Sequence, residues 1–313
     1  MSPALDPIFL RLLERVAPVR PDEPLSRHTT IGIGGPADAF VTVENANQLS
    51  SVVQLCLRSD TPFFVLGSGS NIVVGDAGIR GVTISDKAHA LGEPKLQRNG
   101  EERFHFRAEA GCSFAATARQ LAFAGYAGLE WACGIPGTIG GAVVYNAGAY
   151  GGCLGDVLQR IAIAGEDGEV ELEAADLSLV YRGSAFTRGL MAGRAVLWAE
   201  FALWPGDSEA LRARVADYDS RRLKAQPRGR NAGSFFKNPP EQPAWRLLDA
   251  VGLRGYRVGG AEFSAKHCNF LINAGEAKAA DVAALKNRAQ ERVRDQFGID
   301  LQTEVSLVGE GFE

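Results

Sequence analysis

The stretch GIPGTIGGAVVYNAGAYGG, residues 134–152, holds seven glycines among nineteen residues. Glycine costs backbone entropy on folding, so it is kept mainly where φ is positive or where a ligand approaches the main chain. We therefore expect this stretch to be neither an ordinary strand nor an ordinary helix. Its composition predicts a backbone surface on which a large anionic cofactor lies.

A second glycine-rich stretch, GSGSNIVVGDAGIRG at 67–81, follows the apolar run FFVLG at 63–67. The apolar run is typical of a short buried strand, and the turn after it can direct consecutive N–H groups into one concavity. Such a nest suits phosphate, although a strand connection without a ligand would have the same composition. The stretch lacks the Gly-Lys-Ser/Thr ending of a P-loop.

A partial dinucleotide-binding pattern at Gly32, Gly34 and Ala37 fails on its context. The preceding residues SRHTT are too polar for a buried parallel strand, and Pro36 stands where the helix should begin. We interpret the pattern as a tight turn that leads into a strand.

Composition narrows the class of protein. The chain has 313 residues, 46% of them hydrophobic, and a formal net charge of −4, which favours a globular protein without the basic surface that nucleic acid requires. No apolar run approaches the roughly 20 residues of a membrane span, and the first residues lack signal-peptide features, so we expect a cytoplasmic protein. Five scattered cysteines predict free thiols. The four histidines lack partners at the spacing of metal ligands, so we expect no metal site.

The order of the expected elements divides the chain into three α+β units. Residues 1–80 begin with a helix at 6–16 that Asp6 can cap and a linker-like stretch at 17–27. A strand at 39–43, a helix capped by Asn47 and a strand at 63–67 follow. Residues 81–206 alternate strand patterns with one helix at 113–125, which Ser113 can cap. Residues 207–313 begin with a charged amphipathic helix and close with a last, mainly apolar strand that contains Glu304. We expect active-site residues where units meet.

Seven motifs in order resemble the signatures of the UDP-N-acetylenolpyruvoylglucosamine reductases. They are HTTIGIGGPAD, LGSGSNIVVGDAGIRG, AGLEWACGIPG, YRGSAF, NAGSFFKNP, GGAEFSAKHCNFLIN and LQTEV. The resemblance implies a fold of the p-cresol methylhydroxylase and vanillyl-alcohol oxidase type, with two FAD-binding subdomains (1–80 and 81–206) and a C-terminal substrate domain (207–313). The run PPEQPAWRLLDAVGLRG directly after the FKN of NAGSFFKNP is similar to the shorter subtype of the family.

The same resemblance implies that NADPH reduces bound FAD, which then reduces UDP-N-acetylglucosamine enolpyruvate; no obligate protein partner is implied. Arg182 would hold the substrate carboxylate, and Glu304, with a raised pKa if desolvated, would donate to the same group. Ser234 would give a proton to the adjacent carbon. From the residues alone, Arg182 could instead form a surface ion pair, Glu304 could face water and Ser234 could be a cap.

Contacts with the ligands follow from the same motifs. The resemblance places the substrate beside Tyr181, Lys237 and Asn238, and FAD beside Gly67, Ser68, Gly69, Ser70, Asn71, Gly134, Ile135, Gly137, Gly141, Asn146 and Gly148. The chain departs from the usual pattern at Tyr145, Cys153 and Ser306. Two alternatives remain: another FAD oxidoreductase of the same fold, and a nucleotide-sugar-binding protein without catalysis.

Overall fold

The computed structural model describes residues 5–99 and 101–313 and divides into two compact units. Unit 1 comprises residues 1–20, 40–67 and 81–222, and unit 2 comprises residues 21–39, 68–80 and 223–313. The three functional ranges expected from the sequence subdivide the chain differently and stay a prediction.

The N-terminal helices begin at side-chain caps, as their sequences suggest. Asp6 caps α1 (Pro7–Glu14) by accepting a 2.8 Å hydrogen bond from the Ile8 amide. Helix α2 (Ala46–Arg58) is capped by Asn45, which accepts from the Gln48 amide at 2.9 Å. The expected cap at Asn47 was therefore wrong by two residues, because Asn45 is the residue with extended backbone before the first helical turn.

A four-stranded sheet has the order β1-β2-β5-β3. Its strands are β1 (Val19–Pro24), β2 (Pro36–Val43), β3 (Phe63–Leu66) and β5 (Ile79–Asp86), with β3 and β5 parallel. The turn before β2 confirms our interpretation of the Gly32 pattern. The expectation of a linker at 17–27 was wrong, because β1 occupies most of it; its prolines are tolerated since β1 is an edge strand.

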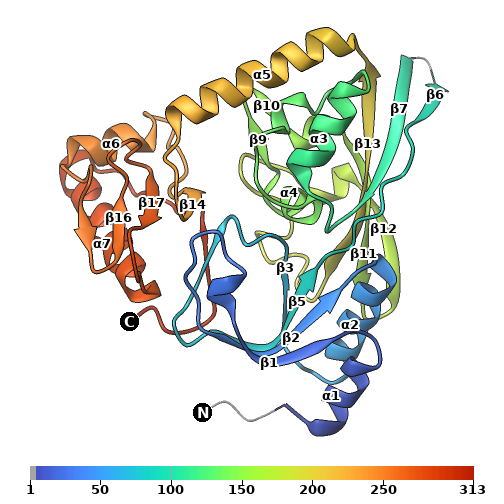
Figure 1. The fold of residues 1–313 in the computed structure, drawn as a ribbon, viewed down its shortest axis with the longest axis horizontal. Coiled ribbons are helices and arrows are strands. Elements are labelled where there is room, and N and C mark those ends of the chain that lie inside the picture. The colour runs from blue at the N-terminus through green and yellow to red at the C-terminus, as the bar shows by residue number, and fades with distance from the viewer. Residues whose placement is uncertain (1–4, 100) are drawn as a thin grey trace. The chain divides into compact units, whose positions relative to one another are not determined.

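The larger sheet of unit 1 is antiparallel and has the order β12-β11-β13-β7-β6, with β8 also paired to β13 (Figure 1). Its strands are β6 (Lys95–Asn99), β7 (Glu101–Glu109), β8 (Tyr126–Ala127), β11 (Leu158–Gly165), β12 (Gly168–Glu173) and β13 (Ala195–Pro205). Helices α2 and α4 (Ile139–Tyr145) both contact β13. The central strand is consequently buried along almost its whole length.

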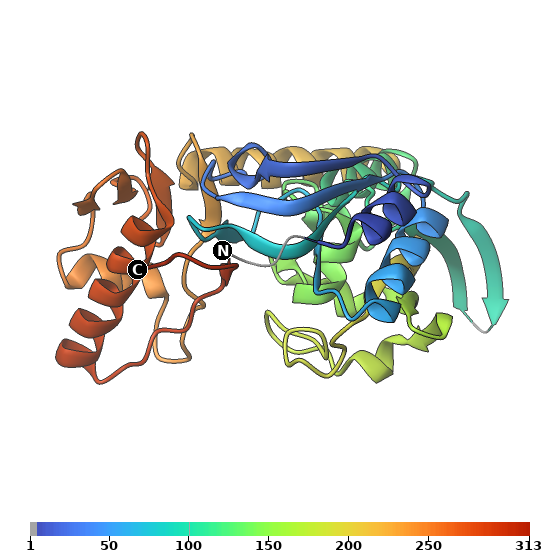
Figure 2. The same cartoon turned by 90° about the horizontal axis from the view of Figure 1, so that it is seen from below.

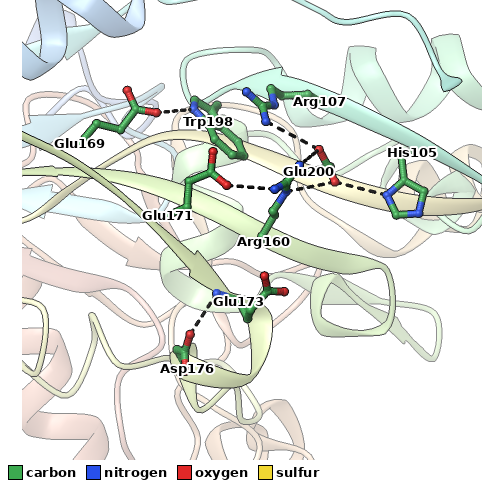
Figure 3. Close-up of polar contacts among 9 residues, drawn as sticks. All are labelled: His105, Arg107, Arg160, Glu169, Glu171, Glu173, Asp176, Trp198 and Glu200. Carbon is green, nitrogen blue, oxygen red and sulfur yellow. Dashed lines mark hydrogen bonds and ion pairs between the residues drawn. The ribbon is translucent and has the colours of Figure 1, made fainter.

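Alternate residues of β13 meet different surroundings. Ala199, Phe201 and Leu203 belong to the apolar core, whereas Trp198 and Glu200 point the other way. Figure 3 shows how charged side chains cover that second face. The Arg107 guanidinium lies 3.5 Å from the Trp198 ring centroid, and Arg160 donates to Glu200 at 3.2 and 3.1 Å.

Helix α3 (Phe114–Phe123) is capped by Ser113, as expected, and α4 is capped by Thr138. Our expectation that residues 134–152 contain no ordinary helix was wrong for Ile139–Tyr145. Glycine is used there for close packing, since a β-carbon at Gly140 would lie 3.0 Å from the Ala110 β-carbon. The segment continues into a small hairpin of β9 (Gly148–Ala149) and β10 (Gly152–Cys153).

Unit 2 is built on an antiparallel sheet of order β14-β17-β16-β15. Its strands are β14 (Asn231–Ser234), β15 (Arg257–Val258), β16 (Ala261–Phe263) and β17 (Phe270–Asn273), and α7 (Ala279–Phe297), the long red helix of Figure 2, contacts β15 and β16. Strands β4 (Ile72–Val74) and β18 (Ser306–Val308) form a separate parallel pair. The remaining helices are α5 (Ser208–Ala225), α6 (Ala244–Ala250) and 3-10 turns at Leu25–Arg27, Glu130–Ala132, Leu154–Asp156 and Ala174–Leu177.

All five cysteines are free thiols, and four of them are buried, which confirms that expectation. Within the described ranges, no helix is both long enough and apolar enough for a membrane span.

One buried carboxyl gives unit 1 a testable pH dependence. Asp86, at the end of β5, is 3% exposed and accepts a 2.9 Å hydrogen bond from the Ala88 amide. Burial raises its pKa from an ordinary 3.8 to about 6, with the nearby Glu109 charge adding to the rise. The folded state therefore holds the proton more tightly than the unfolded state, and stability falls as pH rises from about 4 through 6.

We expect Asp86→Asn to gain stability relative to the wild type as pH increases, because the amide never ionises. Between pH 4 and pH 7.5, the difference in unfolding free energy should shift in favour of the variant by about 2–3 kcal/mol. Urea unfolding at both pH values measures this shift. The exposed Asp167→Asn is the control, and a shift equal to that of the control would contradict the assignment to Asp86.

Candidate active site

The predicted phosphate nest lies in unit 2, where Gly69 has a φ of 63°. A β-carbon at Gly69 would collide with the His28 carbonyl oxygen and lie 2.8 Å from the Thr29 α-carbon. Among the described residues, the amides of Ser68, Gly69 and Asn71 have no hydrogen-bond acceptor. Three neighbouring N–H groups without an acceptor fit an anionic ligand such as a pyrophosphate.

Thr30 joins this nest to the strand that carries Ser234. Its amide donates to the Gly69 carbonyl at 3.0 Å, and its hydroxyl donates to the Asn231 carbonyl at 2.7 Å. Asn231 begins β14 and Ser234 ends it. The HTT motif thus holds the nest and β14 together through one residue.

Glu304 is joined to the same region from the C-terminal side. Its amide donates to the Phe235 carbonyl at 2.8 Å, and its own carbonyl accepts from the Asn71 side chain at 3.2 Å. The expected last strand is present as β18, but the half-buried Glu304 precedes it, so the placement of Glu304 in that strand was wrong; at residues 301–305 an isolated bridge joins Phe236 and Thr303. Unit 2 nevertheless brings together Ser68–Asn71, Ser234 and Glu304.

Asn269 is a supporting residue that sequence reasoning missed. Its carbonyl accepts from the Phe235 amide at 2.7 Å, and its side chain makes two bonds to the Phe236 backbone at 2.9 and 2.8 Å. Because Asn269 is only 3% exposed, these bonds hold the residues after Ser234 in a dry environment. A polar side chain inside the apolar run HCNFLIN was the only signal in the sequence.

The predicted substrate contacts after Ser234 differ in their surroundings. Lys237 is half-buried, and its amide donates to the Gln302 carbonyl at 2.9 Å. Asn238 is exposed, and its side-chain oxygen accepts from the Ala244 amide at 3.0 Å, so this oxygen already caps α6. Their contacts with substrate stay predictions.

The second glycine-rich segment lies in unit 1. A β-carbon at Gly67 would lie 2.5 Å from the Thr138 hydroxyl oxygen, so Gly67 and the start of α4 are in close contact. The amides of Gly134, Gly137 and Thr138 have no acceptor within the described part of the chain, whereas those of Ile135 and Gly141 are used internally. This segment therefore also offers backbone donors that fit an anionic cofactor.

Arg182 occupies the corner of a tight turn in unit 1, with a φ of 53°. Val180 and Gly183 close the turn through backbone bonds of 2.9 and 3.1 Å. Asn146, at the end of α4, donates to the Val180 carbonyl at 2.9 Å and accepts from the Gly155 amide at 3.0 Å. The Asn146 side chain thus holds the Arg182 turn, and its expected contact with FAD stays a prediction.

Three further residues singled out in the sequence, Tyr181, Gly148 and Cys153, also lie in unit 1. Tyr181 is 58% exposed, and its ring centroid lies 5.4 Å from the Arg182 guanidinium carbon. Gly148 packs closely on the hairpin, where a β-carbon would lie 2.7 Å from the Gly152 carbonyl oxygen. Burial, reinforced by Asp156, raises the pKa of the Cys153 thiol, which favours its neutral form.

The two glycine-rich segments and the mixed α/β fold define an FAD-binding oxidoreductase. A family model described as an FAD binding domain matches residues 37–172, and one described as the C-terminal domain of UDP-N-acetylenolpyruvoylglucosamine reductase matches residues 225–308. The chain belongs to the UDP-N-acetylenolpyruvoylglucosamine reductase family, which confirms the resemblance seen in its motifs.

Relatives support this membership over nearly the whole length. The reductase of Geobacter metallireducens is 44% identical over 97% of this chain and 99% of its own length, and that of Desulfosudis oleivorans is 42% identical over 93% and 95%. The crystal structure of the reductase from Thermus caldophilus matches with a TM-score of 0.77 and 32% identity, covering 93% of this chain and 99% of that one.

Two alanine substitutions can separate the effect of the close contact at Gly69 from the effect of its left-handed backbone conformation. Gly69→Ala and Gly255→Ala both place alanine at a φ near 65–70°, but only at Gly69 does the new β-carbon meet other atoms. We expect both variants to lose about 1–2 kcal/mol of stability from the left-handed conformation, and Gly69→Ala to lose more because its β-carbon collides with the His28 carbonyl oxygen. Only Gly69→Ala should lose bound FAD in addition, measured as the ratio of flavin to protein absorbance. Equal flavin content in both would contradict the role of Gly69.

The role of Asn146 in holding the Arg182 turn also has a clear test. Asn146→Asp tolerates the left-handed backbone and keeps the acceptor for Gly155, but loses the donor to Val180. We expect unchanged flavin content and a slower oxidation of reduced enzyme by substrate, by about tenfold. Loss of flavin instead would show that the side chain acts on FAD directly.

Proposed function

We propose that this chain catalyses the NADPH-dependent reduction of UDP-N-acetylglucosamine enolpyruvate to UDP-N-acetylmuramate, a step of peptidoglycan precursor synthesis in the cytoplasm. The observation that carries the proposal is the hydrogen-bonded arrangement of the Ser68–Asn71 nest, Ser234 and Glu304 within unit 2. This arrangement joins backbone amides that could bind a pyrophosphate to two side chains, Ser234 and Glu304, that can donate protons.

FAD, when bound, supplies hydride transfer between NADPH and the methylene carbon of the enol ether. The nest residues Ser68–Asn71 and the amides of Gly134 and Gly137 would hold its anionic groups. The difficulty of the reaction lies in the substrate, because hydride addition leaves negative charge on the neighbouring carbon and its carboxylate.

Arg182 holds the carboxylate in this proposal. A guanidinium can form two parallel hydrogen bonds to a carboxylate and stays charged at all working pH values. The turn at Val180–Gly183, with its support from Asn146, keeps the Arg182 backbone in one conformation. This preorganisation favours the developing enolate over the ground-state substrate.

Ser234 and Glu304 complete the chemistry. The Ser234 hydroxyl gives its proton to the carbanion carbon and regains one from water or a neighbouring group. Glu304 in its protonated form donates a hydrogen bond to the enolate oxygen. Tyr181, Lys237 and Asn238 would contact the UDP-sugar, with Lys237 supplying a cation to its pyrophosphate.

Removal of the Ser234 hydroxyl separates the two halves of the reaction. We expect Ser234→Ala to be reduced by NADPH at nearly the wild-type rate, because no proton donor to carbon is needed there. Its reoxidation by UDP-N-acetylglucosamine enolpyruvate should slow by about 10²–10⁴-fold. Anaerobic stopped-flow absorbance in the flavin band measures both rates.

The same experiment on the wild type decides between the proposal and its alternatives. Rapid reoxidation by the enolpyruvyl sugar supports the reductase. A yellow protein that NADPH reduces but the sugar leaves reduced would be a different oxidoreductase of this fold, and equal slowing of both halves in Ser234→Ala would contradict the assigned role of Ser234.

A further inference from the structure

Asn269 lies directly before β17 and pairs with the backbone that follows Ser234. The regular ladder between β14 and β17 ends at the pair Ser234–Phe270, after a shift in register. Beyond that pair, the Phe235 amide donates to the Asn269 carbonyl at 2.7 Å. The Asn269 side chain then continues the pairing, because its oxygen accepts from the Phe236 amide at 2.9 Å and its nitrogen donates to the Phe236 carbonyl at 2.8 Å. One side-chain amide thus takes the place of a residue in a paired strand.

The segment that carries Glu304 pairs with the same backbone. The Phe235 carbonyl accepts from the Glu304 amide at 2.8 Å, and an isolated bridge joins Phe236 to Thr303. Both backbone polar groups of Phe235 and both of Phe236 are therefore paired, three of them with Asn269 and one with Glu304. The Phe235–Phe236 backbone consequently joins Asn269 to both proton donors of the proposed reaction.

This junction is dry and carries no charge of its own. Phe235 and Phe236 are 1% and 0% exposed, and Asn269 is 3% exposed. Burial lowers the pKa of His267 and raises that of Cys268 to about 12, so both neighbours of Asn269 in this stretch are neutral near pH 7. The bonds of the Asn269 amide are therefore not screened by water or disturbed by an adjacent charge.

The amide of Asn269 does what an apolar side chain of similar size cannot do. An apolar residue would fill the same space but would leave the Phe236 amide and carbonyl without partners, and unpaired backbone groups are costly where water has no access. The backbone would then move to find other partners. Because Ser234 comes directly before Phe235, and Glu304 is bonded to it, such a movement would displace both side chains.

We propose that Asn269 is a positioning residue for the oxidative half-reaction, in which the enolpyruvyl sugar reoxidises the reduced flavin. Its side-chain amide fixes the Phe235–Phe236 backbone and thereby sets the position of the Ser234 hydroxyl relative to the Glu304 carboxyl. The inference rests on the proposed function, which assigns proton donation to these two groups. Both act on one carbon and its carboxylate, so a displacement of either lowers the rate. Reduction of the flavin by NADPH needs neither donor.

Asn273, on β17, provides a matched control. Its side-chain nitrogen donates to the Ile31 carbonyl at 3.0 Å, and its oxygen accepts from two backbone amides at 3.1 and 3.2 Å. Asn269→Asp and Asn273→Asp therefore make the same chemical change. Each keeps the acceptor oxygen and, while the new carboxylate is ionised, loses a donor to a backbone carbonyl. Only Asn269→Asp loses the bond to Phe236.

Aspartate at position 269 regains the missing donor when it is protonated, and burial raises the pKa of such a carboxyl. We expect reoxidation of Asn269→Asp within about threefold of the wild-type rate at pH 5.5, and about tenfold to a hundredfold slower at pH 8.5. Each rate is divided by the wild-type rate at the same pH, which cancels the titration of groups common to both proteins, such as Glu304. Asn273→Asp should stay within about twofold of the wild type at both pH values.

Anaerobic stopped-flow absorbance in the flavin band follows reduction by NADPH and then reoxidation over a range of UDP-N-acetylglucosamine enolpyruvate concentrations. For Asn269→Asp at pH 8.5, the limiting rate of reoxidation should fall. The half-saturating sugar concentration, the rate of reduction by NADPH and the flavin content should change by less than about threefold. This separation distinguishes positioning of the proton donors from a general loss of structure, which would affect all four quantities.

Each outcome decides the inference. Equal slowing of both half-reactions, a relative rate that does not change with pH, or an equal effect in Asn273→Asp overturns it. If the thermal midpoint shows that Asn269→Asp is unfolded at pH 8.5, the decision passes to Asn269→Ser, which is neutral and shorter, and an unchanged limiting rate of reoxidation there overturns the inference. Wild-type protein that the sugar does not reoxidise overturns the proposed function as well, whereas Asn269 variants that match a reactive wild type overturn the inference alone.

Discussion

The unit 2 site depends on the close approach of Gly69 to the backbone of His28 and Thr29. No β-carbon fits at Gly69, so the loop can press against this backbone only with glycine in a left-handed conformation. That approach lets Thr30 bond to both Gly69 and Asn231. The nest, the Ser234 strand and, through Asn71, the Glu304 segment are positioned by this one contact.

In unit 1, the positions of two cationic side chains, Arg182 and Arg222, depend on other contacts. Arg182 lies in a short turn that the Asn146 amide supports, whereas Arg222 lies on helix α5 and reaches the backbone of the glycine-rich segment because Gly134 has no side chain. Neither cation is placed by the large antiparallel sheet directly. Arg107 and Arg160 cover the face of the sheet that carries Trp198 and Glu200, and the candidate residues of unit 1 lie in connections between its strands.

Local patterns predicted much of this arrangement, and their failures have identifiable causes. The caps at Asp6 and Ser113 and the strand before Gly67 follow from the chemistry of residues that are adjacent in the sequence. The helix Ile139–Tyr145 was not predicted, because the entropy cost of glycine argues against a helix. In the structure, Gly140 allows this helix to pack closely on Ala110. Glu304 was expected in the last strand because apolar residues flank it, but Leu301 and Val305 are buried in the core of unit 2 before the regular pairing of β18 begins.

The sequence by itself determined the family, the FAD-binding class of the fold and the identity of the candidate residues, because these depend on motifs that are short and continuous. Tertiary structure alone decided which of those residues support one another. Asn269 beneath Phe235 and Phe236, Thr30 between Gly69 and Asn231, and Arg222 against Gly134 join positions separated by tens to hundreds of residues. The free energy of such contacts depends on burial and on the absence of competing partners, and neither is visible in a linear chain.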